Sequence, residues 1–277
     1  MPQPDKLAEA ISEHYARENL AQRIFDGLAV QGKTQRNLTA ADLAPVDQLH
    51  TGGRTAVYEL VSLAQILPGS RVVDIGGGLG GPARILAGEL RCQVTVLELT
   101  PEFAKVGALL SERLDLANRV HYVCADALSM PFEDAWFDAA WTQHSTMNIS
   151  DKPALYRQLF RTLRRGGRLA MHEIVAGPVA SPHYPTPWAS AAAQSFLLPE
   201  EELRNTIERA GFRPLAWQNI TTESREWFQR AAPPPLPADR VPGLAATLVV
   251  EPEALQAQTR NLLEDRVNVV RAVFERP

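Results

Sequence analysis

Apolar residues recur along this chain with more than one spacing, and the change in spacing divides the sequence. Through residues 5–30 they return at about every fourth position, which predicts helix. Residues 32–50 lose this period and are expected to be irregular, although Thr39 resembles a helix cap. The helical period returns over residues 55–67 and stops at a proline and a glycine.

Beyond residue 70, short apolar runs alternate with helical patterns. Strands are predicted over 71–75, 93–99, 120–125, 137–143, 168–175 and 212–221, and the valine-rich tail allows a seventh over 267–274. Helices are predicted over 82–90, 101–118, 152–164, 199–210 and 253–264. Because strands and helices alternate, the predicted fold class is α/β: a Rossmann-like, doubly wound, mostly parallel seven-stranded sheet with helices on both faces, plus N-terminal helices.

The composition is that of one large domain with additions. The chain has 277 residues, of which 45% are hydrophobic and 22% are charged, enough for a proper core. Its formal net charge of −4 gives no reason to expect nucleic acid or an anionic membrane as a partner. The polar first residues do not resemble a signal peptide, and no apolar run approaches the roughly 20 residues that span a bilayer. We therefore expect a soluble, cytoplasmic protein.

The most informative segment is VVDIGGGLGGPARIL at residues 72–86, where an apolar strand meets a helix through a glycine-dense turn. Glycines let the backbone approach a ligand closely, and the helix start presents unpaired N–H groups to it. The turn therefore predicts a nucleotide cofactor. Because Gly76, Gly78 and Gly81 satisfy G-x-G-x-x-G, and Glu98 follows at the end of the next strand, a nicotinamide dinucleotide remains an alternative.

Two acids favour a cationic adenosyl cofactor over a dinucleotide. Asp74 stands before the glycines, and a carboxylate there repels pyrophosphate but suits a cation. The third strand ends near Asp126 and Ala127. The acid can accept a hydrogen bond from an adenine amine, and the small residue leaves room for the ring. A further glycine pair in LRRGGRL, residues 163–169, precedes the fifth strand.

With these motifs in this order, residues 50–221 resemble the class I S-adenosylmethionine-dependent methyltransferases. The shared features are the glycine loop, the acid that closes the second strand, A-D-A-x-x-x-P-F, the F-D-x-x-W strand and the L-R-x-G-G-R-L turn. The segments His50-Thr51-Gly52-Gly53 and Pro187-Trp188-Ala189 are similar to the small-molecule branch of that family. This branch contains the sarcosine/dimethylglycine, phosphoethanolamine and tocopherol methyltransferases.

The resemblance implies the residues of a cofactor site. It assigns to the cofactor Tyr15, Gly76, Gly77, Gly78, Gly80, Glu98, Leu99, Asp126, Ala127 and Gln143. In this assignment the glycines line the methionine portion and the ribose, Glu98 accepts both ribose hydroxyls, and Gln143 lies beside the methionine group. Tyr15 folds over the cofactor from a lid helix or, as the alternative, only packs that helix on the sheet.

A methyl acceptor that arrives protonated needs a base, and two residues near strand ends are catalytic candidates. His144 follows the fourth strand, and Glu173 lies near the end of the fifth, where His172 points to the opposite face. The alternatives are a histidine that only hydrogen-bonds to the backbone and a carboxylate that is ion-paired or solvated.

The candidates for binding the acceptor are His50, Asn148, His183, Tyr184 and Trp188. Relatives often carry histidine where Asn148 stands, so this position is expected to bind substrate and not to act as a base. Ordinary packing explains single aromatic residues in a proline-rich loop equally well.

The predicted function is transfer of a methyl group by in-line displacement from S-adenosylmethionine to an N, O or C nucleophile of a small molecule, with release of S-adenosylhomocysteine. No nucleic acid is expected, because residues 142–145 read Thr-Gln-His-Ser where base-modifying relatives carry (N/D)-P-P-(Y/F). No metal is expected, because the six histidines lack ligand spacing. The alternatives are an NAD(P)-dependent oxidoreductase and a cofactor-binding protein without methyl-transfer activity.

The expected domain organisation follows the same resemblance. Residues 1–50 form an N-terminal helical lid, and residues 51–277 form the S-adenosylmethionine-binding domain. Residues 176–198 and 222–252 are insertions on the acceptor side, the second of which includes a stiff, proline-rich linker at 231–237. A homodimer is compatible with this sequence.

Overall fold

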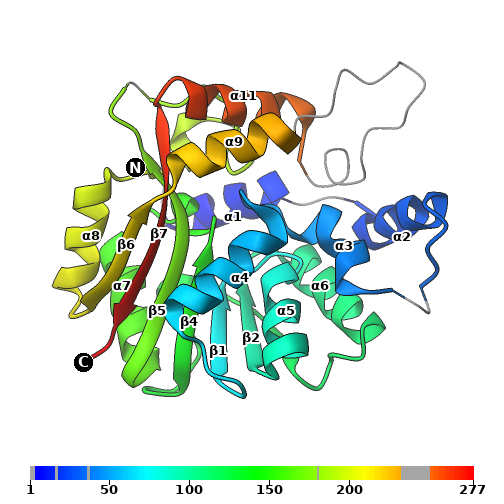
Figure 1. The fold of residues 1–277 in the computed structure, drawn as a ribbon, viewed down its shortest axis with the longest axis horizontal. Helices are drawn as coiled ribbons and strands as arrows, with labels where there is room; N and C mark the ends of the chain where they lie inside the picture. Colours follow the sequence, from blue (N-terminus) through cyan, green and yellow to red (C-terminus); the bar gives the residue numbers. More distant parts are fainter. Residues whose placement is uncertain (1–3, 16–17, 36–37, 180, 232–249) are drawn as a thin grey trace.

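One sheet of seven strands organises the computed structural model, which describes residues 4–15, 18–35, 38–179, 181–231 and 250–277 (Figure 1). The strands are β1 (Arg71–Ile75), β2 (Gln93–Glu98), β3 (Val120–Cys124), β4 (Phe137–Gln143), β5 (Leu163–Ala176), β6 (Arg213–Asn219) and β7 (Val267–Glu275). Their order is β3-β2-β1-β4-β5-β7-β6. β7 runs antiparallel to both of its neighbours, and the pairs among β1 to β5 are parallel. The seventh strand and the α/β fold class are thus confirmed.

Helices cover both faces of the sheet. α4 (Gly53–Ala64) and α5 (Gly81–Leu90) pack their apolar sides on one face in a core that includes Val72 and Trp141. α6 (Pro101–Arg113) packs beside β2 and β3. α7 (Lys152–Thr162) and α8 (Glu200–Arg209) cover the opposite face in a second core that includes Val73 and Met171. Alternate residues of each strand therefore enter different cores, as a doubly wound sheet requires.

The N-terminal region differs from the prediction in two places. Residues 5–30 do not form one helix but two, α1 (Pro4–Tyr15) and α2 (Leu20–Val30), and Asn19 stands before α2 in a left-handed conformation. The stretch predicted to be irregular contains α3 (Ala40–Asp47). Thr39 caps α3 through a capping box with Asp42.

A buried ion pair joins α3 to the main domain. Asp47 at the end of α3 accepts a hydrogen bond from Arg84 of α5 at 2.6 Å, and both side chains are buried. Breaking such a pair leaves an uncompensated buried charge, so the contact fixes α3 against the helix that follows the glycine loop.

The carboxyl ends of the parallel strands form the upper edge of the sheet in Figure 1, and α1, α2 and α3 lie there. Two more helices, α9 (Thr221–Ala231) and α11 (Pro252–Leu263), pack together along the same edge (Figure 1). α9 was not predicted. The linker predicted at 231–237 lies outside the described residues after its first position. In the part of the chain that the structure describes, no helix combines the length and apolar character needed to cross a membrane.

Candidate functional site

The glycine loop lies between the carboxyl end of β1 and the start of α5. Gly76 is exposed and has a φ of +61°, a conformation that strains residues with a side chain. A Cβ at this position would also lie 2.8 Å from Cβ of Ser145, which follows β4. The backbone of Gly76 thus stays bare at the edge of the sheet, where a ligand can approach it.

Glu98 closes β2 and holds the glycine loop in place. Its Oε2 accepts a hydrogen bond from the Gly78 amide at 2.9 Å, and its Oε1 accepts one from the Thr100 amide at 2.8 Å. Burial raises the pKa of this carboxyl, and the amide donors oppose the shift. A carboxylate offers about four acceptor positions, so two remain for a diol such as that of ribose. Leu99 is partly exposed beside it.

Two other glycines of the loop are explained by neighbours within the protein. A Cβ at Gly77 would lie 2.5 Å from Oδ2 of Asp74, whose buried side chain lies beneath the loop. Burial and the nearby Glu98 raise the pKa of Asp74 to about 7. A Cβ at Gly80 would overlap the hydroxyl group of Tyr122 on β3. The role of these two glycines toward a cofactor stays a prediction, since internal packing already requires both.

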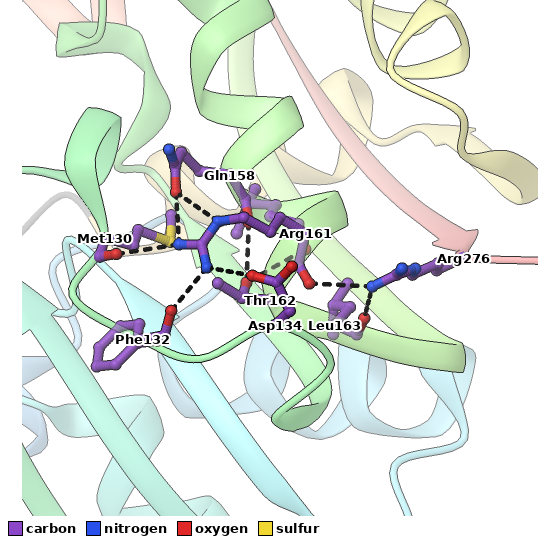
Figure 2. Close-up of polar contacts among 9 residues, drawn as sticks. Met130, Phe132, Asp134, Gln158, Arg161, Thr162, Leu163 and Arg276 are labelled. Carbon is purple, nitrogen blue, oxygen red and sulfur yellow. Dashed lines mark hydrogen bonds and ion pairs between the residues drawn. The ribbon is translucent and has the colours of Figure 1, made fainter.

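The loop after β3 is fixed by an arginine that the sequence analysis did not identify. Asp126 is exposed, and its Oδ1 accepts a hydrogen bond at 2.8 Å from an amide two residues on, at the start of a short 3₁₀ helix that includes Ala127. Arg161 of α7 donates to the carbonyl oxygens of Met130 and Phe132, at 3.0 and 2.7 Å (Figure 2). Arg161 therefore anchors the far end of the loop that carries the predicted adenine contacts.

α1 reaches the same edge of the sheet through Tyr15. Its hydroxyl donates to Oδ1 of Asn148 at 3.0 Å, and its ring packs on Phe103 of α6 with ring centroids 5.8 Å apart. Asn148 donates in turn to the carbonyl oxygen of Trp188 at 2.7 Å. Burial and the charge of Glu98 raise the pKa of Tyr15. Tyr15 is thus held near Glu98, and whether it also covers a cofactor stays a prediction.

Three histidines meet around the end of β4, on the face that α4 covers. Nε2 of Gln143 lies 3.0 Å from Nδ1 of His50 and 3.1 Å from Nδ1 of His172. Oγ1 of Thr51 lies 3.1 Å from Nε2 of His172 and 3.2 Å from Nε2 of His144. We call these five residues the histidine network. The sequence analysis gave His50, Gln143 and His144 separate roles, whereas the structure joins them.

Burial lowers the pKa of every histidine in this network. The pKa of His50 falls to about 4, and those of His144 and His172 fall well below the ordinary value, with the neighbouring histidines adding to the shift. A group that resists protonation in this way is a poor proton acceptor near neutral pH. Within the described residues, no group of three or more His, Cys, Asp or Glu side chains is arranged to hold a metal ion.

Glu173 points to the opposite face of the sheet, as predicted from the alternation along β5. Its Oε2 accepts hydrogen bonds from the amides of Ser145 and Thr146, both at 3.3 Å. Its Oε1 is buried and has no hydrogen-bond partner among the described residues. Burial raises the pKa of Glu173 to about 7, and the ammonium group of Lys152 is among the groups that oppose the shift. Glu173 is therefore neither solvated nor ion-paired at hydrogen-bond distance.

Two of the predicted acceptor-binding residues are engaged by other parts of the protein. The ring of His183 lies 2.8 Å from Glu264, which follows α11. Trp188 is buried in a core with Met147 and donates through its indole N–H to Ser195 at 2.9 Å. Tyr184 is partly buried against the same core. For these three residues the placement supports the packing alternative, and a role in binding the acceptor stays a prediction.

A groove of about 750 Å³ opens beside Tyr15, between the end of α1, the proline-rich segment after β5 and the start of α11. Thr186 and Glu253 are among its lining residues. Its volume is within the range of small-molecule sites.

Comparison with known proteins finds a domain family that matches the central part of the chain. Residues 73–171, which include the glycine loop, Glu98, Asp126 and Gln143, match the family profile described as a methyltransferase domain. This part of the chain is similar to the methyltransferase-domain family. The match runs from within β1 into β5 and so includes the parallel strands and the glycine loop.

Known relatives of the methyltransferase domain act on several kinds of molecule. O-methyltransferase cnsE of Penicillium expansum is 31% identical over 160 residues, 57% of each chain. The chloroplastic tocopherol O-methyltransferase of Arabidopsis thaliana is 36% identical over 99 residues, 36% of this chain and 28% of that protein. The chain thus spans little more than half of the first relative and less of the second.

Solved structures share the fold at low sequence identity. The geranyl diphosphate C-methyltransferase of Streptomyces coelicolor, solved with Mg²⁺, a substrate analogue and S-adenosyl-L-homocysteine, superposes with a TM-score of 0.72 at 18% identity and covers 100% of this chain and 99% of its own. The [4+2]-cyclase SpnF superposes with a TM-score of 0.62 at 22% identity over 80% of each chain. The shared fold therefore does not by itself fix the reaction.

Proposed function

We propose that this protein transfers a methyl group from S-adenosylmethionine to a small-molecule acceptor and releases S-adenosylhomocysteine. The observation that carries the proposal is the pairing of a methyltransferase-domain match with Glu98, a buried carboxylate with unused acceptor positions at the carboxyl edge of the sheet. No feature of the described residues favours a nicotinamide dinucleotide over this cofactor.

The proposed cofactor site is built from the chain's own backbone and acids. Glu98 accepts the ribose hydroxyls, and the bare backbone of Gly76 and Gly78 borders the methionine portion. Leu99 flanks the adenine, and Asp126 and Ala127 lie at its edge. The cofactor, when bound, supplies a methyl group on a sulfonium, so catalysis consists mainly of positioning the acceptor and excluding water.

Gln143 contributes to this site indirectly. Its Oε1 accepts a hydrogen bond from the indole of Trp141 at 3.0 Å, and its Nε2 faces two histidines. Both ends of the amide are thus committed inside the histidine network. We infer that Gln143 places the turn after β4 and that direct contact with the methionine group is secondary.

Glu173 is the better of the two candidate bases. Its pKa, raised to about 7 by burial, suits a group that accepts a proton at neutral pH, whereas the pKa of His144 is lowered by burial. For an acceptor that arrives unprotonated, Glu173 serves instead to hold the turn at Ser145 and Thr146.

The proposed acceptor side extends from the groove beside Tyr15, past Asn148, to the partly exposed His144 after β4. Tocopherol, sterol and phosphoethanolamine methyltransferases are among the relatives, and these names include O-, C- and N-methylation. The acceptor is thus a small molecule with an N, O or C nucleophile. That residues 1–50 act as a lid, that the protein is cytoplasmic and that it forms a homodimer stay predictions.

The proposal is tested with labelled S-adenosylmethionine and a panel of amine, phenol and carbon acceptors. The expected result is label transfer to at least one acceptor class together with saturable cofactor binding. Binding of the cofactor with silence across the whole panel would favour a cofactor-binding protein without transfer activity. Binding of NADH in place of S-adenosylmethionine would favour an oxidoreductase.

A further inference from the structure

The indole of Trp141 determines how the amide of Gln143 is oriented. These residues are two apart on β4 and lie on the same face, where the indole nitrogen is 3.0 Å from one end of the amide. An indole N–H can only donate, so the amide atom facing it is the acceptor, Oε1. The other end of the amide, which faces the histidines, is therefore the NH₂ group.

This NH₂ group determines where two histidines carry their protons. Its two hydrogens point to Nδ1 of His172, at 3.1 Å, and Nδ1 of His50, at 3.0 Å. Nδ1 of His172 must accept, and Nδ1 of His50 accepts in the shorter of its two contacts, so each neutral ring carries its proton on Nε2. Nδ1 of His50 also lies 3.3 Å from the carbonyl oxygen of Thr51, and in this arrangement that longer contact is not a hydrogen bond. The proton on Nε2 of His50 is matched by Oε1 of Gln48 at 3.0 Å. The proton on Nε2 of His172 is matched by Oγ1 of Thr51 at 3.1 Å.

The hydroxyl group of Thr51 connects His172 to His144 and so determines where His144 carries its proton. A hydroxyl group has one hydrogen, and because Oγ1 of Thr51 accepts from His172, its own hydrogen is left for Nε2 of His144 at 3.2 Å. Nε2 of His144 is then an acceptor, and the neutral ring carries its proton on Nδ1. No hydrogen bond joins Nδ1 of His144 to any residue that the structure describes, and this side chain is partly exposed.

The charges around the network favour neutral rings. The positive group nearest to the network is Arg271 of β7, which pairs with His172 across the sheet and is itself ion-paired with Glu59 of α4. Burial lowers the pKa of all three histidines, and the neighbouring imidazoles lower it further for His144 and His172. Protonating His144 at Nε2 would place two donors face to face unless the Thr51 hydroxyl reversed.

We propose that Trp141, Gln143 and Thr51 fix the proton of His144 on Nδ1, so that His144 donates a hydrogen bond to the bound acceptor and is not the base. Trp141, Gln143 and Thr51 are positioning residues in this scheme. The location of the proton stands on the geometry alone, whereas donation to an acceptor rests on the proposed function.

Nuclear magnetic resonance of the resting protein tests the first half. In protein labelled with ¹⁵N in histidine rings, His144 should be protonated at Nδ1, and His50 and His172 at Nε2, with the signals assigned by single histidine variants. Thr51→Val should convert His144 to a mixture of tautomers, whereas Thr51→Ser should leave it unchanged. Exposed His121, outside the network, is the internal control. A proton on Nε2 of His144 in the unmodified protein would overturn the proposal, and so would an unchanged spectrum in Thr51→Val.

Activity of His144 variants tests the second half. His144 has a φ of +49°, which asparagine tolerates well, and the Asn amide nitrogen can take the place of Nδ1–H. His144→Asn should stay within about tenfold of the unmodified rate, because the Asn amide keeps a donor, and His144→Ala should lose more, because it removes the donor. If His144 were the base, both variants would lose about 10²–10⁴-fold, since neither side chain can accept the proton. Equal loss in both variants, with S-adenosylhomocysteine binding unchanged, would contradict donation by His144. If neither the unmodified protein nor any variant transfers methyl groups, the proposed function is wrong. The spectra would still show which ring nitrogen of His144 carries the proton.

Discussion

The two faces of the β4–β5 strand pair carry buried polar clusters of opposite character. On the α4 face, one arrangement of protons gives each side-chain contact of the histidine network one donor and one acceptor. On the α7 face, Glu173 and Tyr156 each have a buried oxygen without a hydrogen-bond partner among the described residues. In the first cluster only Nδ1 of the partly exposed His144 is left for an outside partner, whereas the second cluster leaves fully buried oxygens unpaired.

The difference separates positioning from proton transfer. A satisfied network holds its groups in one geometry and one protonation state, because any change leaves a buried group unpaired. An unsatisfied carboxyl has its pKa displaced toward neutral pH, and such displaced groups gather at functional sites. We therefore infer that the histidine network holds side chains in place, and that the Glu173 carboxyl is the group that gains and loses a proton near neutral pH. Substitutions on each face of the sheet test this assignment.

The largest effect is expected from Glu173→Gln. In the folded protein the pKa of Glu173 is about 7, above its ordinary value of 4.5. The free energy of unfolding is therefore highest below pH 4.5, where Glu173 is protonated in both the folded and the unfolded protein. It falls as the pH rises from 4.5 through 7, because the folded protein holds this proton more tightly than the unfolded chain does. Glutamine keeps the neutral shape, so the variant should gain about 3 kcal/mol in unfolding free energy relative to the unmodified protein between pH 4.5 and pH 8.

Denaturant unfolding at several pH values measures this gain. Glu201→Gln, at an exposed position on α8, is the matched control and should show no such trend. If the unfolding free energies of Glu173→Gln and the unmodified protein differed by the same amount at every pH in this range, Glu173 would not titrate as described.

Thr51→Val should have the next largest effect, with a different signature. It leaves Nε2 of both His144 and His172 without a partner, which costs about 2 kcal/mol of unfolding free energy. Because these rings are already neutral, the cost should not vary between pH 5.5 and pH 8. Thr51→Ser is the control that keeps the hydroxyl. A cost that grows as the pH falls through 6.5 would mean that the network holds a charged histidine.

Arg161→Met should act on the cofactor and not on either cluster. Loss of its hydrogen bonds to Met130 and Phe132 frees the loop that follows Asp126, so affinity for S-adenosylhomocysteine should fall by about fivefold, roughly 1 kcal/mol. Arg157→Met, at an exposed position one turn earlier on α7, is the control. Equal affinities of the two variants, measured by calorimetry, would show that the loop does not contribute to the site.

Tyr15→Phe should have the smallest effect. It removes a single hydrogen bond to Asn148, worth about 0.5–1 kcal/mol, and keeps the packing on Phe103. Amide hydrogen exchange of residues 4–15 should quicken by a few fold and should slow again when cofactor is added. Glu13→Gln, exposed on the same helix, is the control. If the exchange rate of residues 4–15 did not change on adding cofactor, α1 would only pack on the domain and would not act as a lid.

The sequence allowed most of the sheet to be predicted, because buried parallel strands are apolar runs bounded by turns. The bounds of β1 and β4 agree to the residue with those expected. α3 was missed although Thr39 was noted, since Pro45 lies within the helix and argues against it. Tertiary contacts hold this helix, above all the buried pair of Asp47 and Arg84.

For the candidate site, the sequence offered single residues and not the contacts between them. Glu98 and Gln143 could be named because they end apolar strands. The histidine network depends on the strand register that sets Gln143 opposite His172 and on the position of Thr51 beside His172. The spacing of apolar residues along the sequence predicts neither of these. His183 was assigned to the acceptor, yet it meets Glu264, a partner 81 residues away in the chain. Single-sequence patterns carry no information on such pairs.

Calorimetric titration of S-adenosylhomocysteine into the unmodified protein, Glu98→Ala and Glu112→Ala tests the central claim most directly. In the proposed site Glu98 accepts two charge-assisted hydrogen bonds from the ribose, so its removal should weaken binding by at least about 100-fold, roughly 3 kcal/mol. Glu112→Ala, exposed on α6, should bind like the unmodified protein. Failure of the unmodified protein to bind S-adenosylmethionine or S-adenosylhomocysteine would contradict the account.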